Sequence, residues 1–266
     1  MHTVISKDGT TIAFARSGKG SPLILVHGTT ADHTRWNPLL PQLEAHFTVY
    51  AIDRRGRGGS GDAPGYAIER EFDDLAAVAD AIGEAALLLG HSYGAVCALE
   101  ALLRTSNIRK VVLYEPPIRT TGSLYPPGTI ERLQALLDVG DRDGVVSTFF
   151  REVVRAPEEE LRMLRSLPNW GARVAAAHTI PREMRINDEY RFEPARFSAV
   201  RVPTLLLLGG SSPPLFKDAV EAVHAALPVA RVAALPGQQH TAMNTAPELF
   251  LREVLDFFLE PAAPKR

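Results

Sequence analysis

The residues best suited to chemistry in this chain are a serine, a glutamate and a histidine that occur in that order. Ser92 lies at the centre of the pentapeptide G-H-S-Y-G, Glu115 follows an apolar run, and His240 comes near the C-terminus. A serine hydroxyl becomes a nucleophile when a histidine takes its proton and a carboxylate orients that histidine. These residue types therefore predict acyl transfer through a covalent intermediate on Ser92.

The pentapeptide at residues 90–94 has the sequence context of a nucleophile elbow, a tight turn between a strand and a helix. The apolar run Ala86–Leu89 precedes it, and the helix-like stretch Ala95–Leu103 follows it. Glycines two residues on either side of the serine remove Cβ atoms that would clash in so tight a turn. The pattern predicts that the Ser92 hydroxyl stands clear of a sheet. The alternative is a Gly/Ser turn that matches the pattern by chance.

Most of the chain alternates between strand and helix patterns, and these elements must position the three residues. We expect strands at 3–6, 11–15, 23–26, 47–52, 86–89, 110–114, 205–208 and 230–235, and helices at 69–82, 95–103, 216–226 and 247–259. The first two strands are joined by a turn at Asp8-Gly9. Strands alternating with helices predict an α/β fold with a mostly parallel central sheet and helices on both faces.

One stretch interrupts this alternation. Residues 118–198 show no strand pattern and resemble several helices separated by prolines and charges. An insertion here would lie at the carboxyl edge of the sheet, where open α/β sheets bind ligands. We therefore expect a core formed by 1–117 and 199–266 and a helical lid formed by 118–198, the lid segment. Candidates for the pocket wall, each equally suited to ordinary core or surface positions, are Trp36, Trp170, His178 and Met243.

Composition excludes several classes of function. The chain has 266 residues, a net charge of −2 and 45% hydrophobic residues, so neither nucleic acid nor an anionic membrane is expected as a partner. The one cysteine, Cys97, fits a reducing compartment, and no leader pattern is present, which predicts a cytoplasmic protein. The glycines at 56–59 lack dinucleotide-binding spacing, and the predicted chemistry needs no cofactor or metal. No sequence signal indicates an oligomeric state.

Four segments together resemble lidded members of the α/β-hydrolase superfamily over nearly the whole chain. They are H-G-T-T at 27–30, D-x-R-G-x-G-x-S at 53–60, the elbow, and G-x-x-H at 237–240. The resemblance implies an oxyanion hole formed by the backbone N–H groups of Thr29 and Tyr93. It also implies a structural role for the charges of 53–60. His27 and His91, which flank these turns, are expected to form hydrogen bonds with the backbone.

The acid departs from the common pattern of that superfamily. Most members have an aspartate after the strand that is 204–208 here, but this chain continues G-G-S-S-P-P, and Asp218 falls inside the next helix. Glu115 is the predicted substitute, because its strand should lie beside the elbow strand and end at the same cleft. Certain haloalkane dehalogenases and fungal zearalenone lactonases are similar in this respect. The alternative is that Glu115 braces the hinge of the lid segment.

The combined prediction is a serine hydrolase that cleaves a carboxylic ester or lactone, with an apolar substrate of medium size. In this prediction Ser92 is the nucleophile, His240 the base and Glu115 the acid. Two alternatives stay open. The same residues could catalyse C–C or thioester hydrolysis, perhydrolysis or a lyase step, since one fold hosts many reactions. The chain could also be a ligand-binding protein without catalysis.

Overall fold

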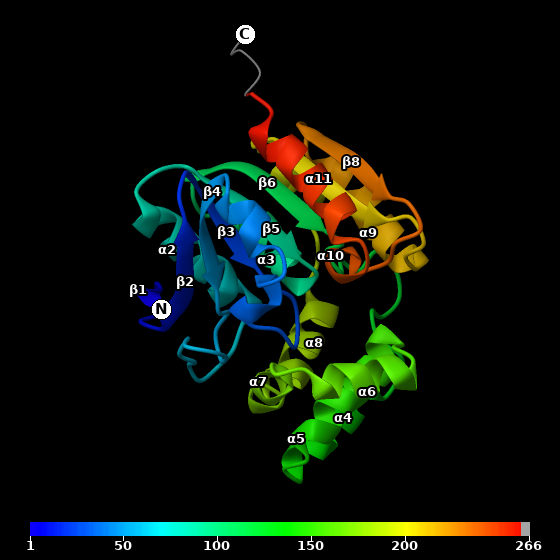
Figure 1. Cartoon of the computed structure of the whole chain (residues 1–266). Coiled ribbons are helices and arrows are strands. Elements are labelled where there is room, and N and C mark those ends of the chain that lie inside the picture. The colour runs from blue at the N-terminus through cyan, green and yellow to red at the C-terminus, as the bar shows by residue number, and fades with distance from the viewer. Residues whose placement is uncertain (262–266) are drawn as a thin grey trace.

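An eight-stranded sheet forms the centre of the computed structural model, which describes residues 1–261 (Figure 1). The strands follow the order β1-β2-β4-β3-β5-β6-β7-β8, and all pairs from β4 to β8 are parallel. They are β1 (His2–Ile5), β2 (Thr11–Gly18), β3 (Ser21–Val26), β4 (Phe47–Ile52), β5 (Ala86–His91), β6 (Ile108–Tyr114), β7 (Thr204–Gly209) and β8 (Ala230–Leu235). The predicted α/β class and mostly parallel sheet are confirmed.

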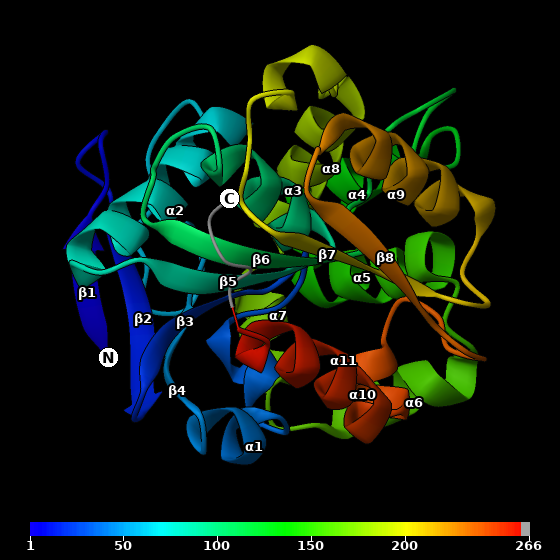
Figure 2. The same ribbon diagram turned by 90° about the horizontal axis from the view of Figure 1, so that it is seen from above.

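Helices cover both faces of the sheet (Figure 2). One face carries α2 (Ile68–Ile82), α3 (Tyr93–Ala101) and α9 (Pro214–Ala226), and the other carries η1 (His33–Trp36), α1 (Leu40–Glu44), α10 (Ala242–Thr245) and α11 (Pro247–Leu259). Successive side chains of a strand point to opposite faces. Thus Ile24 and Val26 join one core, whereas Leu23 and Leu25 join the other. This double burial explains the continuous apolar runs in the sequence.

The boundaries of the elements differ little from the predicted ones. The elbow strand β5 extends to His91, because His91 still pairs with Tyr114 of β6. The elements that the sequence did not predict are short: η1, α1 and α10 have four or five residues each. A helix of one turn is too short to show a helical period. None of the described helices has the length and apolar character needed to cross a membrane.

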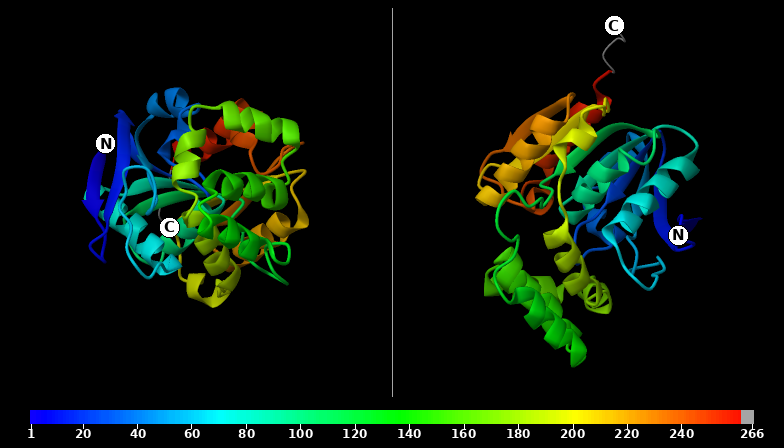
Figure 3. Two further views of the ribbon diagram at one scale, coloured as in Figure 1. Left: turned by 90° about the horizontal axis from the view of Figure 1, so that it is seen from below. Right: turned by 180° about the vertical axis from the view of Figure 1, so that it is seen from behind.

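The lid segment contains helices and no strand. Its helices are α4 (Thr129–Asp138), α5 (Arg142–Thr148), η2 (Phe149–Val154), α6 (Glu158–Ser166), α7 (Trp170–Ala175), α8 (Thr179–Glu189) and η3 (Pro194–Phe197). They lie at the carboxyl end of the parallel strands, on the far side from the last turn of α11 (Figure 3). Leu133, Val146 and Ile180 belong to a separate hydrophobic cluster within this segment. Its role as a lid stays a prediction.

Buried ion pairs connect α8 to the core. Arg54 and Arg57, in the loop after β4, both contact Glu183 of α8, and Arg54 Nη2 also lies 2.6 Å from Glu71 Oε1 of α2. All four side chains are at most 3% exposed. Because a buried charge without its partner is costly, these pairs hold α8 firmly against the core. The charges of this loop thus have the structural role that the resemblance implied.

Candidate active site

Ser92 stands in a strained turn between β5 and α3. Its backbone has φ 57° and ψ −128°, a left-handed region that a residue with a Cβ rarely adopts. A Cβ on Gly90 would lie 2.6 Å from the Gly94 carbonyl oxygen, and one on Gly94 would lie 2.5 Å from the carbonyl oxygens of Val26 and His27. Both glycines are therefore required by close backbone packing, as expected for a nucleophile elbow.

We expect Gly94→Ala to lower the free energy of unfolding by about 3 kcal/mol, because the new Cβ would push α3 away from β3. Denaturant unfolding measures this loss. Gly171→Ala is the matched control. Gly171 lies in α7, an added Cβ there would have no other atom within 4 Å, and alanine favours a helix. A Gly94→Ala variant as stable as the wild type would contradict the packing argument.

Glu115 and His240 form a hydrogen-bonded pair next to the elbow. Glu115 Oε2 lies 2.6 Å from His240 Nδ1, and Oε1 accepts a hydrogen bond of 2.7 Å from the Gly209 N–H. Glu115 is fully buried, and its φ of 47° turns the chain sharply after β6. With Nδ1–H donated to the carboxylate, Nε2 is the ring nitrogen left to accept a proton.

Aromatic and imidazole groups hold the ring and loop of His240 in place. Phe216 of α9 stacks on the ring with centroids 4.3 Å apart and an interplanar angle of 15°. His91 Nε2 donates to the His240 carbonyl oxygen at 2.9 Å, and burial together with the nearby His240 lowers the pKa of His91, which keeps it neutral. The Tyr114 hydroxyl donates to the Gln239 carbonyl. Phe216 was not anticipated, because an aromatic residue in a predicted helix carries no signal of this contact.

The ends of β5 and β6 bring the serine and the glutamate to the same edge of the sheet. His91 and Tyr114 are paired, and the Ser92 N–H donates to the Tyr114 carbonyl at 2.9 Å. Glu115 is the next residue. The hydrogen bonds of the described residues do not include one between Ser92 Oγ and His240 Nε2, so proton transfer between them stays a prediction.

The backbone after β3 packs directly against Ser92. A Cβ on Gly28 would lie 2.8 Å from Ser92 Cβ and 3.4 Å from Ser92 Oγ. Among the hydrogen bonds of the described residues, neither the Thr29 N–H nor the Tyr93 N–H has an acceptor. Two donors without acceptors beside a serine suit the oxygen of a tetrahedral intermediate. Residues 28–31 form the oxyanion loop.

Gly28→Ala is expected to reduce kcat by about 100-fold, because the added methyl group would displace the Thr29 donor from the serine. Steady-state kinetics with an activated ester measure the effect, and thermal unfolding checks that the fold is kept. Gly61→Ala, where the nearest atoms lie 3.5 Å from an added Cβ, serves as the control. An unchanged kcat in the Gly28→Ala variant would show that the oxyanion loop takes no part in catalysis.

Two of the four predicted pocket-wall residues lie in a core cluster, and the other two lie in the lid segment. Trp36 and Met243 are 0% and 1% exposed and belong to the core cluster beneath α11, and their placement in the pocket wall stays a prediction. Trp170 packs in the cluster of the lid segment and donates its indole N–H to Asp143 at 2.8 Å. His178 is half-buried, with Nδ1 3.0 Å from Arg142 Nη2. Large apolar side chains serve core and pocket equally well, so the sequence could not separate the two roles.

His27 and His91 form the backbone hydrogen bonds that were expected of them. His27 Nδ1 lies 2.8 Å from the Gly28 carbonyl oxygen, and its Nε2 accepts from the Arg54 N–H at 3.2 Å. Burial and the nearby arginines hold the pKa of His27 well below its usual value, so the ring stays neutral. His27 thus fixes the oxyanion loop to the loop after β4.

One group of side chains in the described part of the chain has the composition of a metal site. Ligand atoms of Asp32, His33 and Asp53 lie within 4.8 Å of one another. Asp53 accepts hydrogen bonds from the His33 backbone at 2.9 Å, the His33 ring at 2.7 Å and the Gly59 N–H at 2.8 Å. These hydrogen bonds join the loop after β3 to the loop after β4, which explains why the side chains lie close together.

The comparisons with known proteins agree with this geometry. The sequence model of the Alpha/beta hydrolase family matches residues 23–253. The chain belongs to this family. A solved alpha/beta hydrolase from Sphaerobacter thermophilus is 38% identical, with a TM-score of 0.83, and the alignment covers 97% of this chain and all of that one. The prediction of an α/β hydrolase is therefore confirmed. The chain is a hydrolase of this family.

Two curated relatives of this alpha/beta hydrolase carry functional names. N-formylmaleamate deformylase from Pseudomonas putida is 37% identical over 114 residues, which span 41% of this chain and 42% of that protein. 2-(Acetamidomethylene)succinate hydrolase from Mesorhizobium japonicum is 25% identical, and its alignment covers 93% of this chain and 91% of that protein. The first match thus spans less than half of the relative's length.

Proposed function

We propose that this alpha/beta hydrolase cleaves carboxylic esters or lactones of small molecules through an acyl-enzyme on Ser92. The observation that carries the proposal is the 2.6 Å contact between Glu115 and His240, at the sheet edge where the elbow presents Ser92. A carboxylate that fixes the tautomer of a histidine near a half-buried serine is the arrangement that activates a hydroxyl.

In the proposed mechanism His240 Nε2 takes the proton of Ser92 Oγ while Oγ bonds to the substrate carbonyl carbon. The negative oxygen that forms is held by the N–H groups of Thr29 and Tyr93, and Glu115 stabilises the imidazolium. His240 then gives its proton to the leaving alkoxide oxygen, and the C–O bond breaks. A water molecule, deprotonated by His240, then attacks the carbonyl carbon of the acyl-enzyme. The bond from that carbon to Ser92 Oγ breaks, His240 returns the proton to Oγ, and the acid is released.

Hydrolysis of an N-acyl amide is the second candidate. The names of the two curated relatives describe an N-formyl compound and an acetamido compound, which supports this candidate. The same residues would serve, because His240 would protonate a leaving nitrogen in place of an oxygen.

A matched pair of substrates separates the two candidates. The wild-type protein is mixed with 4-nitrophenyl acetate and with 4-nitroacetanilide, and an acid-quenched sample is digested to find the acetylated residue by mass. Acetyl on Ser92 with faster turnover of the ester supports the proposal. Faster turnover of the anilide favours the amide candidate. A folded protein that neither turns over these compounds nor reacts with a fluorophosphonate would overturn both.

A further inference from the structure

Two arginines beside the oxyanion loop lack a carboxylate partner. Arg173 of α7 donates from Nη1 to the Thr30 carbonyl at 3.1 Å and to Thr30 Oγ1 at 2.8 Å, and Arg35 Nη1 donates to Asn244 Oδ1 at 2.8 Å. Arg173 is only 8% exposed, and its Nε is buried without an acceptor. Neither arginine forms an ion pair with any described residue.

The other buried arginines of the described chain behave differently. Arg54 contacts Glu71, Arg55 contacts Asp74, and Arg57 contacts Glu183. A buried guanidinium is costly unless a carboxylate or a similar anion balances it. Where the fold requires a buried arginine for its own stability, it therefore supplies an acid. At the buried Arg173 it does not, and the half-buried Arg35 also has no acid, which indicates that the balancing anion comes from a ligand.

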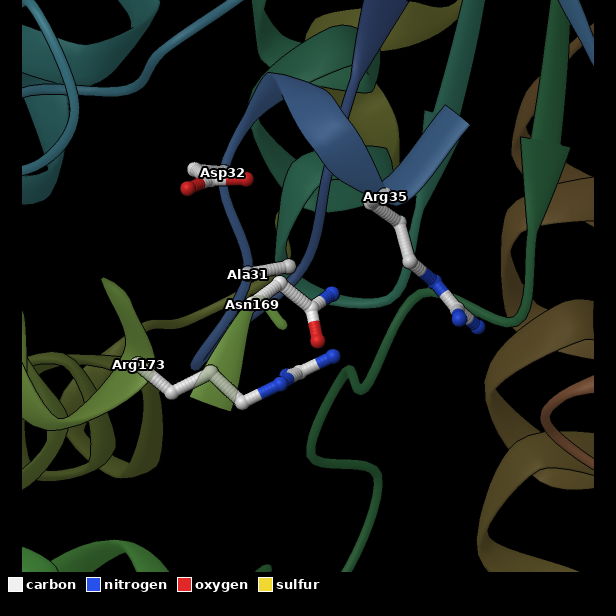
Figure 4. A pocket seen from close by; sticks show the side chains of 5 residues that line it. All are labelled: Ala31, Asp32, Arg35, Asn169 and Arg173. Carbon is white, nitrogen blue, oxygen red and sulfur yellow. The ribbon is translucent and has the colours of Figure 1, made fainter. Parts of the chain in front are cut away.

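The two arginines line the same pocket, which is closed to a water molecule until one of its side chains moves. Figure 4 shows the Arg173 guanidinium beside the side-chain amide of Asn169, whereas Arg35 extends from η1 away from that amide. The pocket there is lined by Ala31, Asp32, Arg35, Asn169 and Arg173. Burial and the nearby Arg173 lower the pKa of Arg35 to about 10, as expected for two cations that repel each other without a counter-charge. Asp32 is the one carboxylate among the lining residues, so two positive charges face a single negative one.

We propose that this pocket binds a free carboxylate group of the substrate, so that the enzyme acts on half-esters or N-acyl compounds that carry an additional acid. The inference rests on the proposed function, because it assigns a substrate class to the same site. A guanidinium pairs with a carboxylate through two parallel hydrogen bonds, and the unpaired Nε of Arg173 belongs to such a fork. Arg173 also holds Thr30, so a bound carboxylate lies one residue from the proposed Thr29 donor.

Kinetics with matched esters test the proposal. Mono-4-nitrophenyl glutarate and 4-nitrophenyl pentanoate differ by an acid in the acyl part, and 4-acetoxybenzoate and phenyl acetate differ by an acid in the alcohol part. We expect kcat/KM to favour the acid in at least one pair by about 10- to 100-fold. Arg35→Gln should remove most of this preference, whereas Arg132→Gln, an exposed arginine of α4 paired with Glu152, should leave it unchanged. No preference in either pair would overturn the proposal.

A binding measurement separates the failure of this inference from the failure of the proposed function. Calorimetry with Ser92→Ala compares glutarate with glutaramide, which has the same length but no charge. We expect glutarate to bind at least ten times more tightly, and the added Arg35→Gln change to remove the difference. Equal binding of the two compounds, or no binding of either, would overturn the carboxylate site. Tight glutarate binding without ester turnover in the wild type would overturn only the proposed function.

Discussion

Replacing Ser92 with alanine is expected to lower kcat by about 10⁶-fold and to abolish labelling by a fluorophosphonate. The predicted nucleophile is lost, and the remaining groups provide only the oxyanion donors and substrate binding. The fold should be retained, because alanine keeps the backbone N–H that bonds to the Tyr114 carbonyl at 2.9 Å.

The measurement is intact mass after exposure to the probe, together with steady-state turnover. Ser211→Ala is a suitable control, because Ser211 is an exposed serine in the loop after β7 and only its backbone N–H is used in a hydrogen bond. A Ser92→Ala protein that still reacts with one equivalent of probe would place the nucleophile elsewhere. If the wild-type protein itself remains unlabelled, the result favours the alternative that the chain binds a ligand without catalysis.

Glu115→Gln should lower kcat by about 10⁴-fold with little change in KM. The amide oxygen can still accept from the Gly209 N–H, but the amide nitrogen then faces His240 Nδ1 and donates to it. That contact selects the tautomer with the proton on Nε2, which cannot accept the proton of Ser92. The loss therefore appears in the chemical step rather than in substrate binding.

A second buried glutamate provides the control for a structural role. Glu100 is also fully buried, and both its oxygens pair with Arg196 at 2.9 and 2.8 Å, away from the elbow serine. Glu100→Gln should reduce thermal stability and leave kcat unchanged. If Glu115→Gln behaves in the same way, Glu115 only braces the lid segment and the acid lies elsewhere.

The sheet and the elbow could be predicted because their signals are local. Buried parallel strands are apolar runs, and the glycines at 90 and 94 are fixed by packing within and next to the elbow. The position of the acid could also be predicted from the sequence, because Glu115 follows a strand that had to lie beside β5. Each of these inferences needs only the order of neighbouring elements.

The pocket could not be predicted, because its contacts join distant segments. Arg35 meets Asn244 across 209 positions, and Arg173 meets Thr30 across 143. In the sequence both arginines look like ordinary charges of a solvated surface. Trp36 and Met243, whose residue types suit a ligand wall, lie in a core cluster. Side-chain roles of this kind depend on tertiary packing that no local pattern contains.

The ion pairs of Glu183 set the boundary at which segments can be exchanged between relatives. A chimera that replaces 118–178 keeps α8, and with it the partner of Arg54 and Arg57. A chimera that replaces 118–198 without supplying an acid at this position leaves Arg57 buried without a carboxylate, whereas Arg54 keeps Glu71. The expected loss is about 3–5 kcal/mol for the broken buried pair. In evolutionary terms, the stretch before α8 is free to diversify with the substrate, whereas α8 must be inherited together with the loop after β4.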